Sequence, residues 1–208
     1  QRRRQRQMCI RDSIWAERVN DVPDTRDAET VRVIAQQYAW NIHYPGPDGR
    51  FGATRIDLVD EQDNPIGLDR SSEFAKDDFT TINQLHIPVN KKIRVDLSSK
   101  DVIHNFKLPE LRVSQDAIPG MVIPVHFTAT STSEEFLKTA VGTKREGKGL
   151  EIACAQLCGL GHYRMKGYVT IHEEDDYQAW LDEQASYLEE EDGDDWGDDG
   201  DDWGDDDW

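Results

Sequence analysis

The feature that most constrains the fold of this chain is a succession of short, β-branched, apolar segments, each ended by a turn residue. In KIRVDLSS at 92–99, Ile93, Val95 and Leu97 alternate with polar residues, as in a strand with one face in the core and one in water. The other predicted strands are 31–44, taken as one strand that ends at the turn 45–49, and 54–59, 82–87, 102–108, 121–130, 150–154 and 165–172. Many short strands separated by turns predict an all-β sandwich or barrel.

A single helix is predicted near the C-terminus, between about residues 173 and 188. Trp180, Leu181 and Leu188 recur there at helical spacing, behind an acidic first turn that suits the helix dipole. Residues 189–208 then hold thirteen Asp or Glu, no Lys or Arg, and a repeated GDDW unit. Such a composition cannot offset chain entropy, so we expect a disordered acidic tail, either merely solvated or a tether for a basic partner.

The predicted organisation is one folded domain between two unlike tails. The opening QRRRQRQMCIRDS, residues 1–13, carries five Arg and fits nothing downstream. We exclude it from the fold, either as non-native sequence that resembles translated adapter or as a disordered basic arm. A hydrophilic linker at 14–29, a folded domain at 30–188 and the tail at 189–208 complete the chain of 208 residues, which is long enough for one core that is stable without disulfides.

The charge distribution excludes some classes of partner. The formal net charge is −18, and residues 14–188 alone carry −9. An acidic surface repels nucleic acid and attracts a basic protein through long-range, salt-sensitive steering. The chain has no run of about 18 apolar residues, so we expect neither a membrane span nor a signal peptide within it.

The residues that carry chemistry are gathered in CAQLCGLGHYRM, where Cys154, Cys158, His162 and Met165 are closely spaced, with His104 fifty residues earlier. Two thiolates, two imidazoles and a thioether form a soft ligand set that selects copper over magnesium or calcium. Two thiolates can bridge two coppers, each of which would take one imidazole. Met165 would then be a weak ligand on one side, and a backbone carbonyl on the other.

Three other interpretations of this loop stay open from the residues alone. The two cysteines and two histidines could hold a structural Zn²⁺ tetrahedrally, although zinc leaves Met165 unexplained. The cysteines could instead form a disulfide, with Cys9 as the odd third one. The domain could also bind partners without any metal.

Four stretches in a fixed order resemble the CuA-binding part of cytochrome c oxidase subunit II. They are AQQYAWNIHYPGPDGRFG from 35, HNFKLP from 104, DAIPG from 116 and CAQLCGLGHYRM from 154, and the likeness spans roughly 30–185. The resemblance implies a cupredoxin-like Greek-key β-barrel. It also implies an electron-transfer subunit of a haem-copper terminal oxidase, whose two-copper CuA centre takes electrons from cytochrome c and passes them to haem in subunit I for dioxygen reduction.

The same resemblance assigns the copper ligands. They are the side chains of His104, Cys154, Cys158, His162 and Met165, together with the main-chain carbonyl of Gln156. Many members have Glu in place of Gln156, and its carboxylate also helps to bind magnesium or manganese at the junction with subunit I. A neutral amide is a poorer ligand for a hard cation, so this second site is in doubt. Asp116 is a remaining carboxylate near the junction, or else it stabilises the turn that follows it.

Residues for contact with the donor protein also follow from the resemblance. Tyr38 stands where many members carry an exposed Trp through which the electron enters, and its alternative role is packing on the barrel. Asp101 matches an acidic docking position for the lysine-rich face of cytochrome c, and Asp48 is a second candidate.

The family normally has two N-terminal membrane helices that hold the copper domain at the outer face of the bilayer. Because they are missing here, we expect a truncated chain from the periplasmic face of a bacterial inner membrane, attached there through the missing helices. A naturally soluble form stays open. Two other functions are the CuA domain of nitrous oxide reductase and a mononuclear copper carrier or assembly module.

Overall fold

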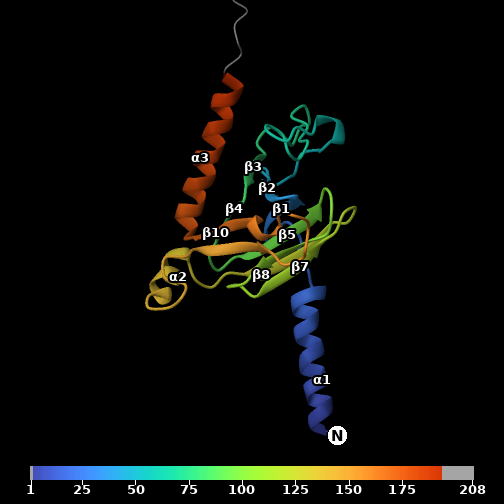
Figure 1. The fold of residues 1–208 in the computed structure, drawn as a ribbon, viewed down its shortest axis with the longest axis vertical. Coiled ribbons are helices and arrows are strands. Elements are labelled where there is room, and N and C mark those ends of the chain that lie inside the picture. The colour runs from blue at the N-terminus through green and yellow to red at the C-terminus, as the bar shows by residue number, and fades with distance from the viewer. Residues whose placement is uncertain (1, 194–208) are drawn as a thin grey trace, which may run out of the picture.

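The structure of the protein is a computed structural model that describes residues 2–193, with side chains from 6 to 188. Most of the acidic tail, from residue 194 onwards, therefore lies outside the described residues. Within them, the strands form two five-stranded sheets that enclose one core (Figure 1).

Each sheet is mixed, with one parallel pair. The first has the order β3-β2-β1-β5-β8, formed by Phe79–Ile82, Ala39–Tyr44, Glu29–Gln36, Lys92–Ser99 and Ile123–Thr128. The second has the order β4-β10-β9-β6-β7, formed by Gln84–Pro88, Lys166–His172, Leu150–Cys154, His104–Leu108 and Val113–Ala117. Strands β1 and β5 are parallel, as are β4 and β10, and the remaining pairs are antiparallel.

The core lies between the two sheets. In β5 the alternation seen in the sequence is reproduced, with Ile93, Val95 and Leu97 fully buried and their neighbours partly exposed or exposed. Trp40 of β2 and Phe106 of β6 meet edge to face in the interior, with ring centroids 5.5 Å apart. Each such buried apolar side chain contributes roughly 1.5–3 kcal/mol to folding.

The segment 31–44, predicted as one strand, is a hairpin. Strands β1 and β2 are antiparallel, with Gln36 opposite Ala39, so Gln37 and Tyr38 alone form the turn. The prediction was wrong because this turn contains none of the Gly, Asn, Asp or Pro residues that usually mark a two-residue hairpin. As a consequence, Gln37 and Tyr38 project from one end of the sheet.

Further elements differ from the prediction, and the segment 82–87, predicted as one strand, is divided between β3 and β4 of different sheets. Residues 54–59 are not a strand, and Ile56–Leu58 form a 3₁₀ turn within the long connection between β2 and β3. Strand β7 and helix α2, Ser133–Ala140, were not predicted. Helix α2 begins with a capping box, in which Thr132 accepts a hydrogen bond from the Glu135 amide and Glu135 accepts one from the Thr132 amide.

The long connection between β2 and β3 is attached to the barrel by a buried hydrogen bond. His43 Nε2 lies 2.6 Å from Asp78 Oδ2, and both side chains are fully buried. The same Asp78 oxygen accepts a hydrogen bond from the Gly52 amide at 2.7 Å. A buried polar side chain is stable only when it is hydrogen-bonded in this way.

Two long helices leave the barrel on different sides (Figure 1). Helix α1, Arg2–Trp15, continues into a π-helical turn, Ala16–Asn20, and its described apolar side chains are exposed, so it adds nothing to the core. The segment predicted as a non-native or disordered arm is thus helical, and its origin stays a prediction. No helix among residues 2–193 is both long and apolar enough to cross a membrane.

Helix α3, Glu174–Gly193, follows β10 directly. It begins where the sequence predicted a helix and continues five residues into the segment assigned to the tail. Tyr177 is buried, and Trp180 and Leu181 pack against the core. The helix therefore covers the barrel end that is remote from residue 165.

Candidate metal centre

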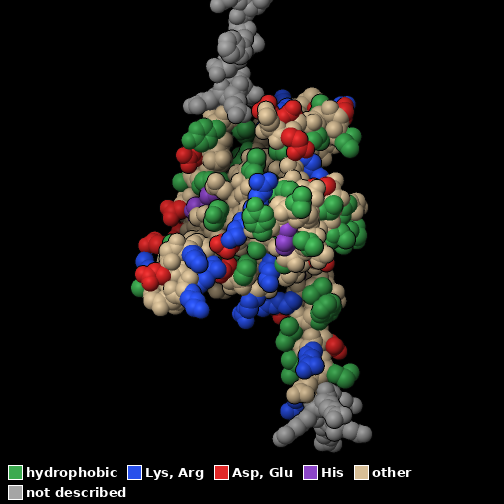
Figure 2. All heavy atoms as spheres, in the orientation of Figure 1, with side chains coloured by type: hydrophobic (Ala, Val, Ile, Leu, Met, Phe, Trp, Pro, Cys, Tyr) green, Lys and Arg blue, Asp and Glu red, His purple; other side chains and the backbone are tan. Residues whose placement is uncertain are grey.

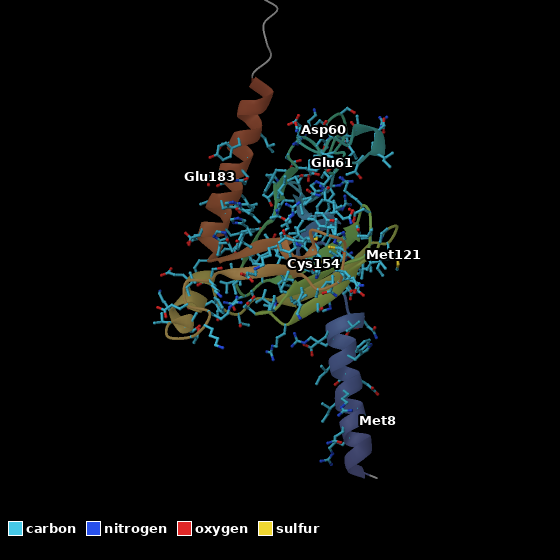
Figure 3. The ribbon with its side chains drawn as sticks, viewed as in Figure 1. Met8, Asp60, Glu61, Met121, Cys154 and Glu183 are labelled. Carbon is cyan, nitrogen blue, oxygen red and sulfur yellow. The ribbon has the colours of Figure 1, made fainter. Side chains whose placement is uncertain are left out.

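The predicted ligands converge where β6, β9 and β10 meet. His104 is the first residue of β6, Cys154 is the last of β9, and Cys154 lies opposite Phe106 in the ladder that joins these strands. The loop 155–165 then returns to β10, which begins immediately after Met165. Figure 3 labels Cys154 among the side chains of the barrel.

The two cysteine sulfurs form the middle of the site. Cys154 Sγ and Cys158 Sγ lie 3.7 Å apart and are free thiols, since a disulfide requires about 2.05 Å. Met165 Sδ is 3.7 Å from Cys158 Sγ. The disulfide interpretation is therefore not the arrangement in this structure.

Both imidazoles present Nδ1 to this sulfur group. His162 Nδ1 lies 3.6 Å from Cys158 Sγ, and His104 Nδ1 lies 3.9 Å from Cys154 Sγ and 3.1 Å from Met165 Sδ. The ligand atoms of His104, Cys154 and Cys158 all lie within 4.8 Å of one another. The side chain of Gln156 is exposed, but its carbonyl oxygen is 3.1 Å from Cys154 Sγ.

The orientation of His104 is fixed from its other side. His104 is fully buried, and its Nε2 lies 2.8 Å from Asp101 Oδ1. A proton on Nε2 directed at the carboxylate leaves the Nδ1 lone pair free and aimed at the sulfurs, as in many carboxylate–histidine–metal arrangements. Two thiols, two inward Nδ1 atoms, a thioether and a carbonyl are donors that fit a soft-metal pair bridged by sulfur.

Two pKa shifts belong to this site. Burial, followed by the nearby Cys154, raises the pKa of the Cys158 thiol to about 11. Burial would also raise the pKa of Asp101, but hydrogen bonds from His104 and from the amides of Gln37 and Val102 lower it overall. Without metal the Cys158 thiol is therefore protonated at neutral pH, whereas Asp101 is ionised and able to accept from His104.

Tyr38, in the turn between β1 and β2, packs against the loop 155–165 that carries the proposed ligands. A Cβ atom added to Gly161 would come within 2.5 Å of the Tyr38 ring, and one added to Gly159 within 2.7 Å of its hydroxyl. The Arg164 guanidinium lies 5.5 Å from the ring centroid on the same loop. The tyrosine is partly exposed, so it contacts both the ligand loop and the solvent.

Two other predicted residues are not brought to the sulfur group. Asp48 is exposed and follows β2, so it lies at the opposite end of that strand from Tyr38. Asp116 is close in the ladder, opposite Asn105, but its carboxylate accepts a hydrogen bond from the Asn105 side chain at 2.7 Å.

Gln37 contacts the site although the sequence analysis assigned it nothing. Its side-chain Nε2 donates to the carbonyl of Cys158 at 2.6 Å, and its amide donates to Asp101 Oδ2 at 2.6 Å. The only sequence signal was its position beside Tyr38, because the contact with residue 158 depends on the hairpin.

Exposed apolar side chains surround the site and form what we call the apolar rim. Its members are Val102, Ile103, Leu157, Leu160 and Tyr163, and Leu160 is 96% exposed. Figure 2 shows further hydrophobic side chains gathered at the right-hand edge of one face, on the side where Figure 3 labels Met121, with Lys and Arg lower down towards α1. A patch of this kind around a buried site indicates a surface that contacts other proteins.

Comparison with known proteins gives one family. Residues 29–171 match the family described as cytochrome c oxidase subunit II, periplasmic domain. The alternative cytochrome c oxidase subunit 2 of Bradyrhizobium diazoefficiens is 36% identical over 162 residues, which cover 77% of this chain and 53% of that protein. Cytochrome c oxidase subunit 2 of Cereibacter sphaeroides is 29% identical, covering 74% of this chain and 48% of the relative.

A solved structure supports the same assignment. The periplasmic domain of subunit II of the cytochrome oxidase of Bradyrhizobium japonicum matches with a TM-score of 0.52 and 27% identity, covering 80% of this chain and 99% of that one. The predicted cupredoxin-like fold is thereby confirmed. The chain spans about half the length of the curated relatives it matches. It belongs to the cytochrome c oxidase subunit II family and corresponds to the periplasmic CuA domain of that subunit.

Proposed function

We propose that this chain is the electron-transfer domain of a haem-copper oxidase that accepts single electrons from a c-type cytochrome for delivery to haem in subunit I, where dioxygen is reduced. The observation that carries the proposal is the convergence of six soft and neutral donors, two of which are thiols with their sulfurs 3.7 Å apart. When bound, a copper pair held by these donors would supply one-electron redox chemistry. The chain itself makes and breaks no substrate bond.

The proposed ligands act from a rigid frame. The six are His104, Cys154, Cys158, His162 and Met165 through their side chains and Gln156 through its carbonyl. Three of them, His104, Cys154 and Met165, lie at the ends of strands of one sheet, which limits their movement. Little movement between redox states favours fast electron exchange, because the ligands need not rearrange when the charge changes.

Tyr38 and the apolar rim are the proposed contact for the cytochrome. The ring of Tyr38 is the aromatic group that touches the ligand loop, at Gly159 and Gly161. Asp101 keeps its side chain 31% exposed beside this rim, so it is the better placed of the two docking carboxylates. Asp48, at the far end of β2, would act only through long-range attraction.

Haem in subunit I is the proposed acceptor of the electrons. This domain would lie on the periplasmic side of the membrane to which the full-length protein would be anchored. We propose no magnesium or manganese site on this chain at that junction. Gln156 offers a neutral amide there, and the Asp116 carboxylate is hydrogen-bonded to Asn105. A hard divalent cation prefers charged oxygens, which would have to come from the partner.

The first test is copper stoichiometry with visible and EPR spectra of the copper-loaded protein. Wild type should bind two coppers per chain with a purple colour and a seven-line EPR pattern. Cys154→Ser and Cys158→Ser should each abolish all three. Cys9→Ser is the matched control, because Cys9 is an exposed cysteine of α1 far from the ligands, and it should behave as wild type.

Other outcomes of this test would overturn the proposal. One copper with a four-line spectrum would indicate a mononuclear carrier, and zinc alone would indicate a structural site. If the pair is present, stopped-flow mixing with reduced cytochrome c tests the partner. Electron uptake should slow as salt rises and should be slower in Tyr38→Ala than in Tyr38→Phe, which keeps the ring against Gly161.

A further inference from the structure

The turn between β1 and β2 contacts two halves of the metal centre that come from different parts of the chain. One half is His104 at the start of β6, together with Asp101 just before it. The other half is the loop 155–165 between β9 and β10, which carries Cys158. Phe106 lies opposite Cys154 in the ladder between these halves, and the Ala155 amide donates to the Asn105 carbonyl at 3.2 Å. These backbone contacts fix the start of the loop, whereas Cys158 lies three residues beyond Ala155.

A continuous chain of hydrogen bonds through Gln37 joins the two halves. Its Nε2 donates to the Cys158 carbonyl at 2.6 Å, and its amide donates to Asp101 Oδ2 at 2.6 Å. The other oxygen of Asp101 is 2.8 Å from His104 Nε2. The backbone of Cys158 is therefore linked through Gln37 and Asp101 to the imidazole of His104.

The shape of the loop is adapted to the same turn. Gly159 has a φ of +127°, and a Cβ there would lie 2.7 Å from Gln37 Nε2 as well as from the Tyr38 hydroxyl. The Cβ of any residue replacing Gly161 would meet the Tyr38 ring. The loop backbone thus approaches the turn as closely as glycine permits.

We propose that Gln37 is a positioning residue that fixes the distance and orientation of the Cys158 side of the centre relative to His104. The inference rests on the proposed function, since the group being positioned is the copper pair. Gln37 touches none of the ligand donor atoms and acts only through the Cys158 carbonyl and Asp101. A displaced half would make the two metal positions unequal, and the electronic properties would report it.

A merely structural hydrogen bond predicts something different. The Gln37 side chain is exposed, so its loss should barely change global stability. If it positions the ligands, its loss should instead alter the spectrum and potential of the loaded centre while the fold is unaffected. The two roles therefore differ in which measurement moves.

The experiment compares Gln37→Met and Gln37→Glu with the adjacent Gln36→Met. Methionine is close in size to glutamine but cannot donate to the Cys158 carbonyl, and an ionised glutamate in its place would repel that oxygen. Gln36 is the matched control, because its side-chain amide forms hydrogen bonds with Glu61, Asn41 and Lys100 and not with the ligand loop. The amide of residue 37 stays in every variant, so only the side-chain link is cut.

All three variants should bind two coppers and unfold as wild type does. The Gln37 variants should lose resolution of the seven-line EPR pattern and shift the one-electron equilibrium with a redox mediator at least three-fold, about 30 mV by the constant of 59 mV per tenfold. Electron uptake from reduced cytochrome c should slow with unchanged apparent affinity. Gln36→Met should match wild type throughout.

Two results would overturn the inference and are distinguishable. If wild type holds the copper pair and the Gln37 variants match Gln36→Met in EPR and potential, Gln37 does not position the centre. If wild type itself holds no copper pair, the proposed function fails together with the inference. A Gln37 variant that unfolds more readily but has a wild-type spectrum counts as the first result.

Discussion

Two pairs of histidines lie at opposite ends of this barrel, and only one pair faces sulfur donors. Strand β10 begins next to Met165 and ends at His172, so its seven residues separate the ends by roughly 20 Å. At the far end His86 Nδ1 lies 2.8 Å from His172 Nε2, and the two share one hydrogen bond. At the metal end the Nδ1 atoms of His104 and His162 face sulfur instead.

The difference is in the lone pairs rather than in the residue type. The His86 ring stacks on Trp180 at 4.2 Å and 1°, so it is held on its face as well as by its edge. Burial, followed by the nearby His172, lowers the pKa of His86 to about 4, so it is neutral at pH 7. The far pair is satisfied by itself, whereas Asp101 occupies one nitrogen of His104 and leaves the other aimed at the ligands.

The largest expected difference between the ends comes from removing one imidazole at each. His104→Gln should abolish the two-copper spectrum. The substitution removes one imidazole ligand and leaves a buried amide group facing the sulfurs. His172→Gln should keep both coppers, the purple colour and the EPR pattern. Metal analysis with EPR checks this comparison, and a copper deficit in His172→Gln would contradict it.

Copper loading should respond strongly to pH. Because burial raises the pKa of Cys158 to about 11, its thiol must release a proton on binding metal at any lower pH. Through the loss of this Cys158 proton alone, the apparent affinity of the protein for copper should rise about tenfold per pH unit, which is roughly a hundredfold between pH 6 and 8. Competition with a copper chelator of known affinity measures this. An affinity independent of pH would mean that the thiol is already ionised.

Truncating the aromatic side chain at the far end should affect stability and not the metal. Trp180→Ala removes stacking on His86 and contacts with Tyr44 and Phe79. Since Trp180 is partly exposed, the free energy of unfolding in urea should fall by about 2 kcal/mol, below the 3–5 kcal/mol of a fully buried site. The copper spectrum should be unchanged, and Tyr187→Ala, an exposed aromatic of the same helix, is the control.

The smallest effect is the acid sensitivity of the far pair. A histidine whose folded pKa is about 4 against an ordinary 6.5 binds its proton more readily when unfolded. Stability should therefore be complete above pH 6.5 and fall as the pH drops towards 4, by about 1–2 kcal/mol after allowance for partial exposure. Urea unfolding between pH 7 and 4.5 checks this, and His86→Gln should lose that part of the slope.

The strands with clean alternation could be predicted from sequence, and the turns could not. Strands β5 and β9 occur at the predicted residues because their patterns are local. The hairpin at Gln37 was missed because its turn lacks glycine, asparagine, aspartate and proline. Helix α2 had a readable capping box in Thr132 and Glu135, but its short charged sequence gave no apolar periodicity.

For the site, the proposed ligands could be predicted from the sequence because four of the ligating side chains lie within twelve residues. The structure places His104 beside these residues, although it lies fifty residues earlier in the chain. The bond between Asp101 and His104, and the reach of Gln37 to Cys158, depend on strands brought together by the fold. No local pattern encodes such contacts, which is why Asp101 was assigned only to docking.

The glycines beneath Tyr38 have a consequence for tunnelling. Electron tunnelling falls steeply with the separation of donor and acceptor, so each layer of atoms between them costs rate. Because Gly159 and Gly161 have no side chain, the ring rests on bare backbone of the ligand loop. In the proposed function, a methyl group at Gly161 would therefore act as an insulating spacer, lengthening the path by about the thickness of one carbon.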